Sequence, residues 1–446
     1  AARAMAPREA GRGGLEAPLL ARGRGGGPPS LRPLWAVTLL EGTAFVIAMV
    51  PAFSLRFREL AKAEGLDAAA TAVMLGRLQA VRSAVEFVAT PTLTFWSDRT
   101  GRRPVMLLCA TALTLQMLCL ALARSLWAFG AVFVAFGLLS NSNGALEATC
   151  IADATEPGAS RSLAFGRLYT VIGAVMVVGP LVGGWLTSID GRVPFFAGAA
   201  LCTGGVFFAA WQLPEYLSEK RHRGRVLRRS SSAEALGGVL RGSPSTTWFI
   251  CASVFSALGV GAFASAQVLW LREVFGFDSR GVGSFLSLNG LLLIASQGVL
   301  LPRLLKAFSG REARLVQLGL LWTAAKLAAL GLAPSTAWLW AAQIAGIGGS
   351  CAVAPLRNLC TKAVPESHQG ALAGTVSGAS TAAQVVGSVL GSQVFAASLR
   401  GGVPAGSFLF VGAAAHCAAV VCVSRGAILD TKQKADVDLP EIAAGA

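Results

Sequence analysis

Ionisable side chains inside long apolar stretches are the residues of this sequence that are best placed to do chemistry. A charge in hydrocarbon costs about 2.5–3.5 kcal/mol, so each of these residues needs either a partner or a function. A carboxylate or an amine in such a place can carry a proton or hold a charged solute. These candidates are Glu41, Arg77, Arg82, Glu86, Glu147 and Lys326.

The spacing of the candidates suggests which of them are paired. Arg82 and Glu86 are four residues apart, so on a helix they share a face and can form an ion pair, either a structural one or part of a site. Glu41 has no obvious local partner. It is therefore the best candidate for coupling to a proton or another cation, and the alternative is an ion pair with Arg82 or Arg77. Lys326 either takes part in a site or snorkels toward the outer surface.

Amide side chains in the same stretches can line a polar cavity, although each alone is as well explained by hydrogen bonding between helices. Gln116 and Gln384 are included in the candidate site. The full set is Gln116, Gln267, Asn289, Gln343, Asn358 and Gln384.

The composition indicates which elements must position these residues. Of the 446 residues, 54% are hydrophobic and only 14% are charged, whereas a soluble domain has about a quarter charged residues. A membrane-spanning helix needs about 20 mostly apolar residues, and strands of a lipid-embedded barrel would alternate over about ten residues instead. The sequence therefore predicts an all-α integral membrane protein with twelve transmembrane helices. They are expected near 33–55, 71–95, 104–123, 127–151, 163–187, 193–213, 247–271, 281–302, 313–332, 336–356, 370–396 and 404–424.

The longest interior gap, 214–246, is basic and divides the twelve stretches six and six. We expect a disordered tail (1–32), two six-helix bundles (33–213 and 247–424) joined by this loop, and a C-terminal tail (425–446). Basic residues concentrate on one side: Arg99, Arg102, Arg103, Arg303, Lys306, Arg311, Arg314 and the central loop. By the positive-inside rule, both termini and the central loop are predicted to be cytoplasmic.

Other classes of protein fit poorly. The net charge is +15, but the basic residues form short clusters between apolar stretches, which argues against nucleic-acid binding. No GxxxxGK[ST] phosphate loop is present, and the three histidines and nine cysteines have no catalytic, metal-ligand or disulfide spacing. We therefore predict neither an enzyme nor a cofactor or metal site. The expected partners are the lipid bilayer and a small solute, with protons as a further candidate.

The two halves of the sequence look like repeats. Gly166, Gly179 and Gly183 are each followed 208 residues later by a glycine, at 374, 387 and 391, and the strings VVGPLVGG and VVGSVLGS match in register. Repeated halves are typical of secondary transporters, which bind solutes near mid-membrane between the halves. The fold expected is thus two pseudo-symmetric six-helix bundles.

The string SDRTGRR, at residues 97–103, lies between the second and third stretches and resembles the signature loop of the major facilitator superfamily, G-x-x-x-D-R-x-G-R-R. Thr94 replaces its leading glycine. Gly101 permits a tight turn. The resemblance implies a conformational latch in which Asp98 faces the start of the eleventh helix, near Gly370, and a motif arginine pairs with Asp153. The latch residues implied are Asp98, Arg99, Gly101, Arg102, Arg103, Asp153 and Arg161.

A second string, IADATEPGASRSLAFG at 151–166, followed by GAVMVVGPLVGGW, resembles the tetracycline–proton antiporters and the hippocampus-abundant-transcript-like proteins. Gly179, Pro180, Gly183 and Gly184 match the Gly-Pro-x-x-Gly-Gly pattern of that branch and, with Gly387 and Gly391, suit close helix packing. The arginine common in helix four of proton-coupled members is absent, with Phe133 or Val134 in its region.

The resemblance implies alternating-access transport of a small solute, of the drug or organic-solute efflux type, possibly coupled to protons through Glu41. Two alternatives remain open at this point. The chain can be a passive uniporter, or a receptor or sorting protein that kept the fold and lost transport.

Overall fold

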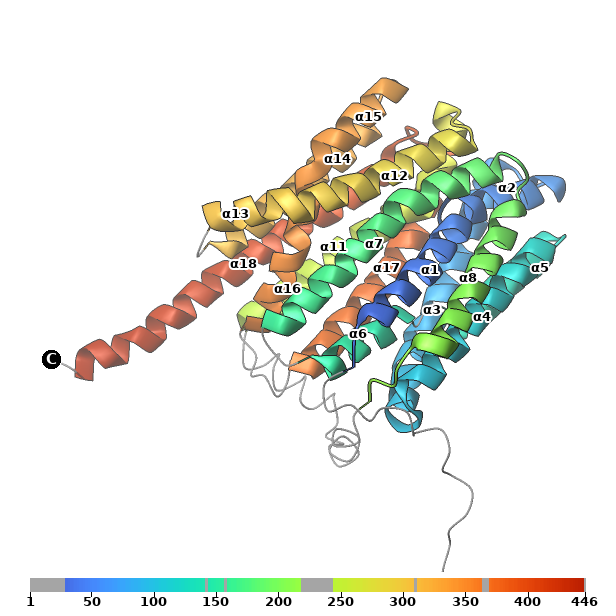
Figure 1. The fold of residues 1–446 in the computed structure, drawn as a ribbon. Coiled ribbons are helices and arrows are strands. Elements are labelled where there is room, and N and C mark those ends of the chain that lie inside the picture. The colour runs from blue at the N-terminus through green and yellow to red at the C-terminus, as the bar shows by residue number, and fades with distance from the viewer. Residues whose placement is uncertain are drawn as a thin grey trace, which may run out of the picture.

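The computed structural model describes residues 29–140, 143–155, 159–217, 244–308, 311–362 and 369–444, with side chains except at 91, 159–163, 361–375 and 432–444. Within these ranges every regular element is helical (Figure 1). The long helices run roughly parallel to one another, as expected of a bundle whose length is set by the thickness of a bilayer.

The N-terminal half contains six helical segments, two of which are interrupted by a short π or 3₁₀ turn. In chain order they are α1 (Arg32–Ile47) with η1 (Ala48–Ala52) and α2 (Phe53–Ala63); α3 (Ala68–Thr100); α4 (Arg102–Leu122); α5 (Leu126–Ala135) with η2 (Phe136–Leu138) and α6 (Asn143–Ala154); α7 (Ala159–Thr187); and α8 (Val193–Gln212).

The C-terminal half repeats this order. Its segments are α11 (Pro244–Phe275); α12 (Ser279–Ala295) with η3 (Ser296–Leu300) and α13 (Leu301–Ala307); α14 (Glu312–Gly331); α15 (Thr336–Ala345) with η4 (Gly346–Ala352) and α16 (Val353–Lys362); α17 (Gln369–Leu399); and α18 (Ser407–Ala444).

Each of the twelve predicted stretches corresponds to one of these segments, and the predicted fold class is confirmed. Among the described residues, eleven segments are long and apolar enough to cross a membrane. The remaining one is α3, whose hydropathy is lowered by Arg77, Arg82 and Glu86. The last helix runs beyond the predicted span, which ended at residue 424, as far as Ala444.

Helix pairing is the same in the two halves. In the N-terminal half α1 packs on α7 and α8, and α4 packs on α8; in the C-terminal half α11 packs on α17 and α18, and α14 packs on α18. The main contacts between halves also form a symmetric pair, α7 with α12 and α3 with α17. The repeat seen in the sequence is thus a repeat of structure.

The repeated glycines explain this symmetry at the level of atoms. A Cβ added at Gly183 of α7 would overlap the carbonyl oxygen of Ile47 in α1, and one added at Gly391 of α17 would overlap that of Ala262 in α11. The backbones therefore touch, as small residues allow helices in lipid to do. Gly184 plays the same role between the halves, against the backbone of Gly283 in α12.

A 3₁₀ turn interrupts the fourth segment of each half. Segment four contains the 3₁₀ turn η2, and segment ten contains the 3₁₀ turn η4. Such turns inside long helices often mark functional hinges. In the N-terminal half, the turn separates α5 from α6, so α6 is a short helix of its own.

The two halves are held together at the end away from the termini, the upper right of Figure 1. There Arg58 of α2 forms an ion pair with Glu273 of α11, and the Arg280 Nε donates to the Ser188 Oγ over 3.0 Å. Toward the terminal end, the Arg357 guanidinium donates to the hydroxyl of Tyr169 over 3.3 Å.

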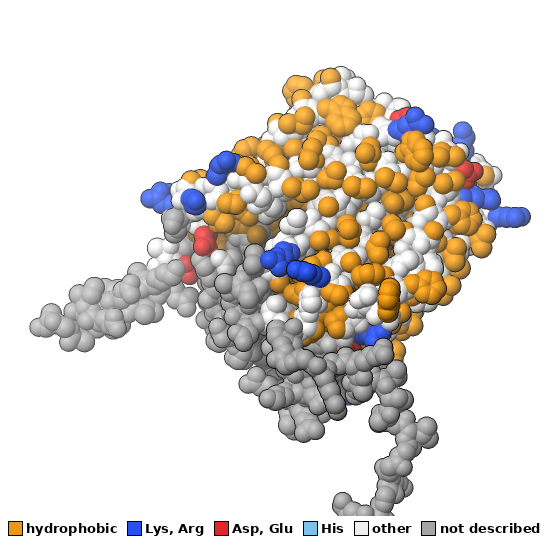
Figure 2. Space-filling view, in the orientation of Figure 1, with side chains coloured by type: hydrophobic (Ala, Val, Ile, Leu, Met, Phe, Trp, Pro, Cys, Tyr) orange, Lys and Arg blue, Asp and Glu red, His pale blue; other side chains and the backbone are white. Residues whose placement is uncertain are grey.

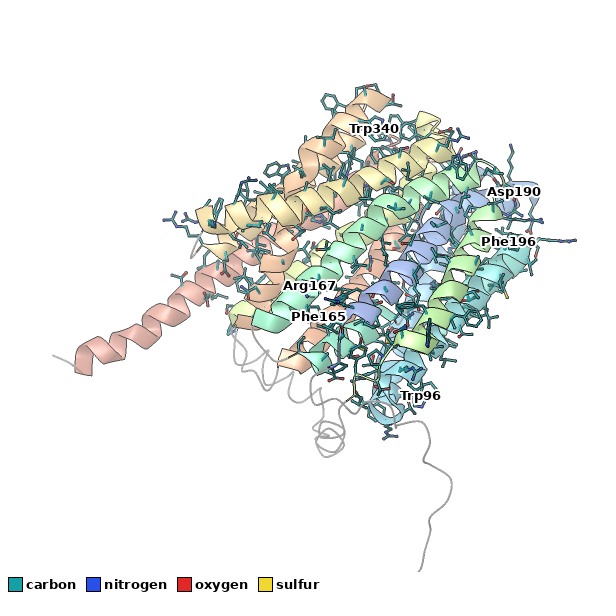
Figure 3. All side chains as sticks on the ribbon, viewed as in Figure 1. Trp96, Phe165, Arg167, Asp190, Phe196 and Trp340 are labelled. Atoms are coloured by element: carbon teal, nitrogen blue, oxygen red, sulfur yellow. The ribbon has the colours of Figure 1, made fainter. Side chains whose placement is uncertain are left out.

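The sides of the bundle are apolar, as a surface in contact with lipid must be. Figure 2 shows hydrophobic side chains spread over the face formed by α7 and α12, with basic residues mainly near the ends of the helices. In Figure 3, Trp96 lies at the terminal end, and Asp190 and Trp340 lie toward the other. Tryptophan is typical of membrane–water interfaces.

The glycine contact gives a direct test of helix packing. We expect Gly183→Ala to lower the free energy of unfolding by about 1–3 kcal/mol, because its Cβ would push α1 and α7 apart. The matched control is Gly166→Ala in the same helix, where a Cβ would meet open space and should be neutral or stabilising by up to about 1 kcal/mol. Thermal unfolding of the detergent-purified variants measures both. Equal effects of the two substitutions would contradict the packing described here.

Candidate functional site

A cavity of about 250 Å³ lies inside the N-terminal half, between α1, α4, α6 and α7. Most of its wall is apolar, with Phe45, Leu113 and Met176 among the lining residues. Its polar lining is concentrated on α1 and the region of segment four around η2 and α6, and consists of Thr38, Glu41, Ser140, Asn143 and Glu147.

Glu41 is buried, and its only described hydrogen-bond partner is an amide. The Asn143 Nδ2 donates to the Glu41 Oε2 over 2.5 Å. The helix α1 brings Glu41 to mid-bundle, since it lies nine residues after Arg32, about 14 Å along a helix. The alternative prediction, an ion pair with Arg82 or Arg77, is wrong, because Arg82 is held elsewhere and Arg77 has an exposed side chain.

Glu147 is a second buried carboxyl group in the same cavity. It accepts a hydrogen bond from the Thr38 Oγ1 over 2.8 Å. Thr38 lies on α1, one turn before Glu41. The sequence marked Glu147 as a charge within an apolar stretch but did not include it in the site. Nothing local could have done so, because its partner Thr38 lies 109 residues away in the chain.

Neither carboxyl group forms an ion pair with any residue that the structure describes. Two carboxylates cannot share a small, mostly apolar cavity at low cost while both are charged. Protons or a bound cation must therefore offset their charge. This arrangement can take up and release protons, or exchange them for a cationic group.

Arg82 and Glu86 form the ion pair that their spacing predicted, with the Arg82 Nε 2.6 Å from the Glu86 Oε1. The guanidinium also donates to the Phe133 carbonyl over 2.8 Å and to the Ser140 Oγ over 3.1 Å, and it lies over the Phe133 ring. These contacts reach both sides of the turn η2. They favour the structural interpretation, in which Arg82 fixes the break between α5 and α6.

Three other predicted site residues do not line this cavity. Gln116 is fully buried in α4, and neither atom of its amide has a described hydrogen-bond partner. Gln384 lies exposed on α17, where its backbone touches Gly261 of α11. Lys326 lies in the C-terminal half and does not snorkel to the surface; its side chain crosses Gly346 within the bundle.

The signature loop has a buried arginine at its centre. Arg102 is fully buried, and its guanidinium lies 2.5 Å from the Asp98 Oδ1 and 3.1 Å from the Asp153 Oδ2. The predicted pairing of a motif arginine with Asp153 is thus present. Contact of Asp98 with the region of Gly370 stays a prediction, because the side chains around Gly370 lie outside those described.

A residue that the sequence analysis did not assign to the latch, Glu215, closes this loop. Its carboxylate accepts hydrogen bonds from the backbone N–H groups of Arg102 at 2.8 Å and Arg103 at 3.1 Å, the first residues of α4. Such a cap satisfies amides that a helix leaves unpaired at its start. Two features require glycine at position 101. Its φ is +103°, which other residues rarely adopt, and a Cβ there would lie 2.6 Å from the Glu215 Oε2.

The remaining latch residues are more peripheral. The Arg99 guanidinium lies over the ring of Phe95, 4.5 Å from its centre, and the Arg103 guanidinium donates to the carbonyl of Ala210. The side chain of Arg161 lies outside the described residues.

The predicted packing residues lie where helices approach closely. Gly179 faces Val46 of α1, and Gly387 faces the backbone of Leu258 and Ala262 in α11. Pro180 remains inside α7, and its carbonyl lies against Gly283 of α12.

The short helix α6 connects the cavity with the signature loop. It carries Asn143 and Glu147 in the cavity and, about 9 Å further along the helix from Glu147, Asp153 beside Arg102. A shift of α6 that follows protonation in the cavity would also move the partner of Arg102.

Two six-helix bundles of matching topology, a cavity that holds two buried carboxyl groups, and close backbone contacts between the bundles define a polytopic membrane transporter. The family model of the Major Facilitator Superfamily matches residues 34–392 of this chain. The chain therefore belongs to this superfamily, and it is a multi-pass transporter of a small solute and not an enzyme.

Known proteins similar to this chain fit that assignment. The class C tetracycline resistance protein of Escherichia coli is 26% identical over 361 residues, which cover 79% of this chain and 87% of that protein. Hippocampus abundant transcript-like protein 1 of Bos taurus is 27% identical over 313 residues, or 69% of this chain and 61% of that protein. The predicted resemblance to these two groups is confirmed.

Solved structures show the same fold. The human organic anion transporter MFSD10 (TETRAN) superimposes with a TM-score of 0.64 at 19% identity, covering 89% of this chain and all of that one. The peptide transporter POT in complex with sulfate superimposes with a TM-score of 0.66 at 15% identity, covering 92% and 96%.

The buried arginine can be tested against an exposed one from the same loop. We expect Arg102→Gln to lower the free energy of unfolding by about 3–5 kcal/mol, because it leaves Asp98 and Asp153 without their shared cation. Arg99→Gln should change it by no more than about 0.5 kcal/mol, since Arg99 is exposed. Thermal unfolding in detergent compares them. If the two variants melt alike, Arg102 does not hold this end of the structure together.

Proposed function

We propose that this protein transports a small organic solute by alternating access and couples transport to protons through Glu41 and Glu147. The observation that carries the proposal is the pair of buried carboxyl groups in one cavity, with no described basic partner. In membrane-spanning segments, unpaired ionisable groups of this kind mark ion and proton pathways.

The hydrogen bonds to Asn143 and Thr38 suit this role. Each partner is neutral, so it can hold a carboxyl group in place whether or not the group carries a proton. Uptake of a proton reduces the repulsion between Glu41 and Glu147 and lets the cavity close around them. Loss of the proton reverses that change.

The conformational change would follow the two glycine-lined contacts between halves, α7 with α12 and α3 with α17. Rocking about these contacts requires the ion pair of Arg58 with Glu273 to break when the cavity opens to the other side. The helix α6 would pass the change on to Arg102, because it carries both Glu147 and Asp153.

We propose that transport runs in the direction of efflux. Relatives named for tetracycline resistance support this direction. The absence of the helix-four arginine, whose region holds Phe133 or Val134, points to a coupling site built from Glu41 and Glu147 instead. By the positive-inside rule, the basic loops favour cytoplasmic termini, although Arg56, Arg58 and Lys62 of α2 reduce the charge difference between the two sides.

Proteoliposome flux tests this coupling. With tetracycline as the probe and an imposed pH gradient, the unaltered protein should accumulate the probe. Glu41→Gln and Glu147→Gln should each reduce accumulation at least about tenfold, because the lost carboxyl group no longer exchanges a proton. Equilibrating flux without a gradient should remain measurable in both variants.

The matched control is Glu59→Gln, which removes an exposed carboxylate from the ion pair with Arg56 on α2 and should accumulate the probe normally. Undiminished accumulation by Glu41→Gln would remove Glu41 from the mechanism. Flux that equilibrates but never accumulates would identify a passive uniporter, and no flux with any of a panel of organic solutes would favour the receptor alternative.

A further inference from the structure

Lys326 is a charged residue in the middle of the C-terminal half. Its ammonium lies 5.8 Å from the centre of the Phe263 ring, and its aliphatic stem crosses Gly346. Phe263 lies twelve residues before Phe275, where α11 ends. Gly346 lies ten residues after Thr336, where α15 begins. At about 1.5 Å per residue both are 15–18 Å below the helix ends, so the ammonium lies near mid-membrane.

Between residues 244 and 429, no carboxylate that the structure describes is placed to neutralise Lys326. Between residues 244 and 429 the sequence contains only four acidic residues. Three of them are at helix ends: Glu273 pairs with Arg58, Asp278 caps α12, and Glu312 lies in the first turn of α14. The fourth, Glu366, falls between α16 and α17, outside the described residues. Among the described residues up to 429, this bundle therefore offers no counter-charge to Lys326.

Comparison of the two halves shows that a cation at this position is not a requirement of the fold. Met117 of α4 packs on Gly198 of α8, and Leu327 of α14 packs on Gly412 of α18, so these pairs are equivalent. The residues preceding them, Gln116 and Lys326, therefore occupy matching positions. One half has a neutral amide where the other has an ammonium.

Two residues of the tenth segment, Gly346 and Gln343, accommodate the side chain of Lys326. A Cβ at residue 346 would overlap the side chain of Lys326, so glycine is needed there. Gln343 lies three residues earlier on the same face of α15; it is 2% exposed, and its Oε1 has no described hydrogen-bond partner. Its Nε2 is bonded to Asn289 of α12. Lys326 itself is half-buried and forms no ion pair among the described residues.

We propose that Lys326 binds the anionic group of the transported solute, and that the solute is an organic anion whose apolar body packs on Phe263. This inference rests on the proposed transport function and adds the charge of the solute to it. The two halves then divide the work: the N-terminal half holds the protons on Glu41 and Glu147, and the C-terminal half holds the negative charge of the solute.

Binding to the detergent-purified full-length protein tests the proposal without any need for transport. Three probes share one apolar body and differ in charge: 1-naphthoate, 1-naphthylmethanol and 1-naphthylmethylammonium. A ligand at free concentration c that binds the folded state stabilises it by RT ln(1 + c/Kd), so at equal concentrations the tighter ligand raises the melting temperature more. We expect 1-naphthoate to stabilise the protein more than the neutral probe, and the cationic probe to stabilise it least.

Substitutions assign that preference to a residue. Lys326→Gln, which installs the residue of the other half, should weaken binding of 1-naphthoate about ten- to a hundredfold and leave the neutral probe unchanged. Gly346→Ala keeps the charge but displaces the side chain, and should weaken the same probe. Lys306→Gln, an exposed lysine at the end of α13, is the matched control and should bind like the unaltered protein.

The outcomes separate this inference from the proposed coupling. Equal binding of the three probes, or 1-naphthoate binding retained in Lys326→Gln, would overturn the role of Lys326. Loss of anion binding in Lys326→Gln, with pH-driven accumulation still dependent on Glu41, supports both proposals. Anion selectivity that depends on Lys326, combined with accumulation insensitive to Glu41→Gln, would leave this inference standing and remove proton coupling.

Discussion

The cost of placing a charge in hydrocarbon separates the structural charges of this protein from those available for function. Arg82 and Arg102 are buried, and each meets at least one carboxylate together with several oxygen acceptors. These two residues hold helices in place. Glu41, Glu147 and Lys326 are also inside the membrane, but none of them forms an ion pair among the described residues. In the mechanism that we propose, protons and the solute supply their counter-charges.

Close packing of backbones suits the movement between the halves that we propose. In lipid there is no hydrophobic force to press helices together, so contacts depend on small residues that let backbones approach. Gly183 and Gly391 provide such contacts within the two halves, and Gly184 with Gly283 provides one between them. A surface of backbone contacts has few interlocking side chains, so one half can rock against the other. The ion pair of Arg58 with Glu273 links the two halves through opposite charges, and it lies at the end away from the termini.

The break in segment four turns one long helix into two parts with different roles. Arg82 holds the turn η2 from α3, and α6 continues beyond it with the cavity residues near its start and Asp153 near its end. Segment ten has a longer break, η4, where Gly346 makes room for Lys326. The pseudo-symmetric architecture thus places an irregular turn beside each of the two groups of unpaired charges.

The sequence by itself determined that the protein lies in a lipid bilayer, how many helices cross it, and that the two halves of the chain are repeats. These properties depend on composition and on spacing that is local or periodic. It also determined the ion pair of Arg82 with Glu86, which needs only the helical period, and the role of Gly101 in a tight turn. Only the tertiary structure brought Glu147 to Thr38 and Glu215 to the start of α4, since these partners are about a hundred residues apart in the chain. It also excluded a pair of Glu41 with Arg82 and turned Lys326 inward. Which charges remain unpaired is decided by long-range packing, and a linear sequence does not contain those distances.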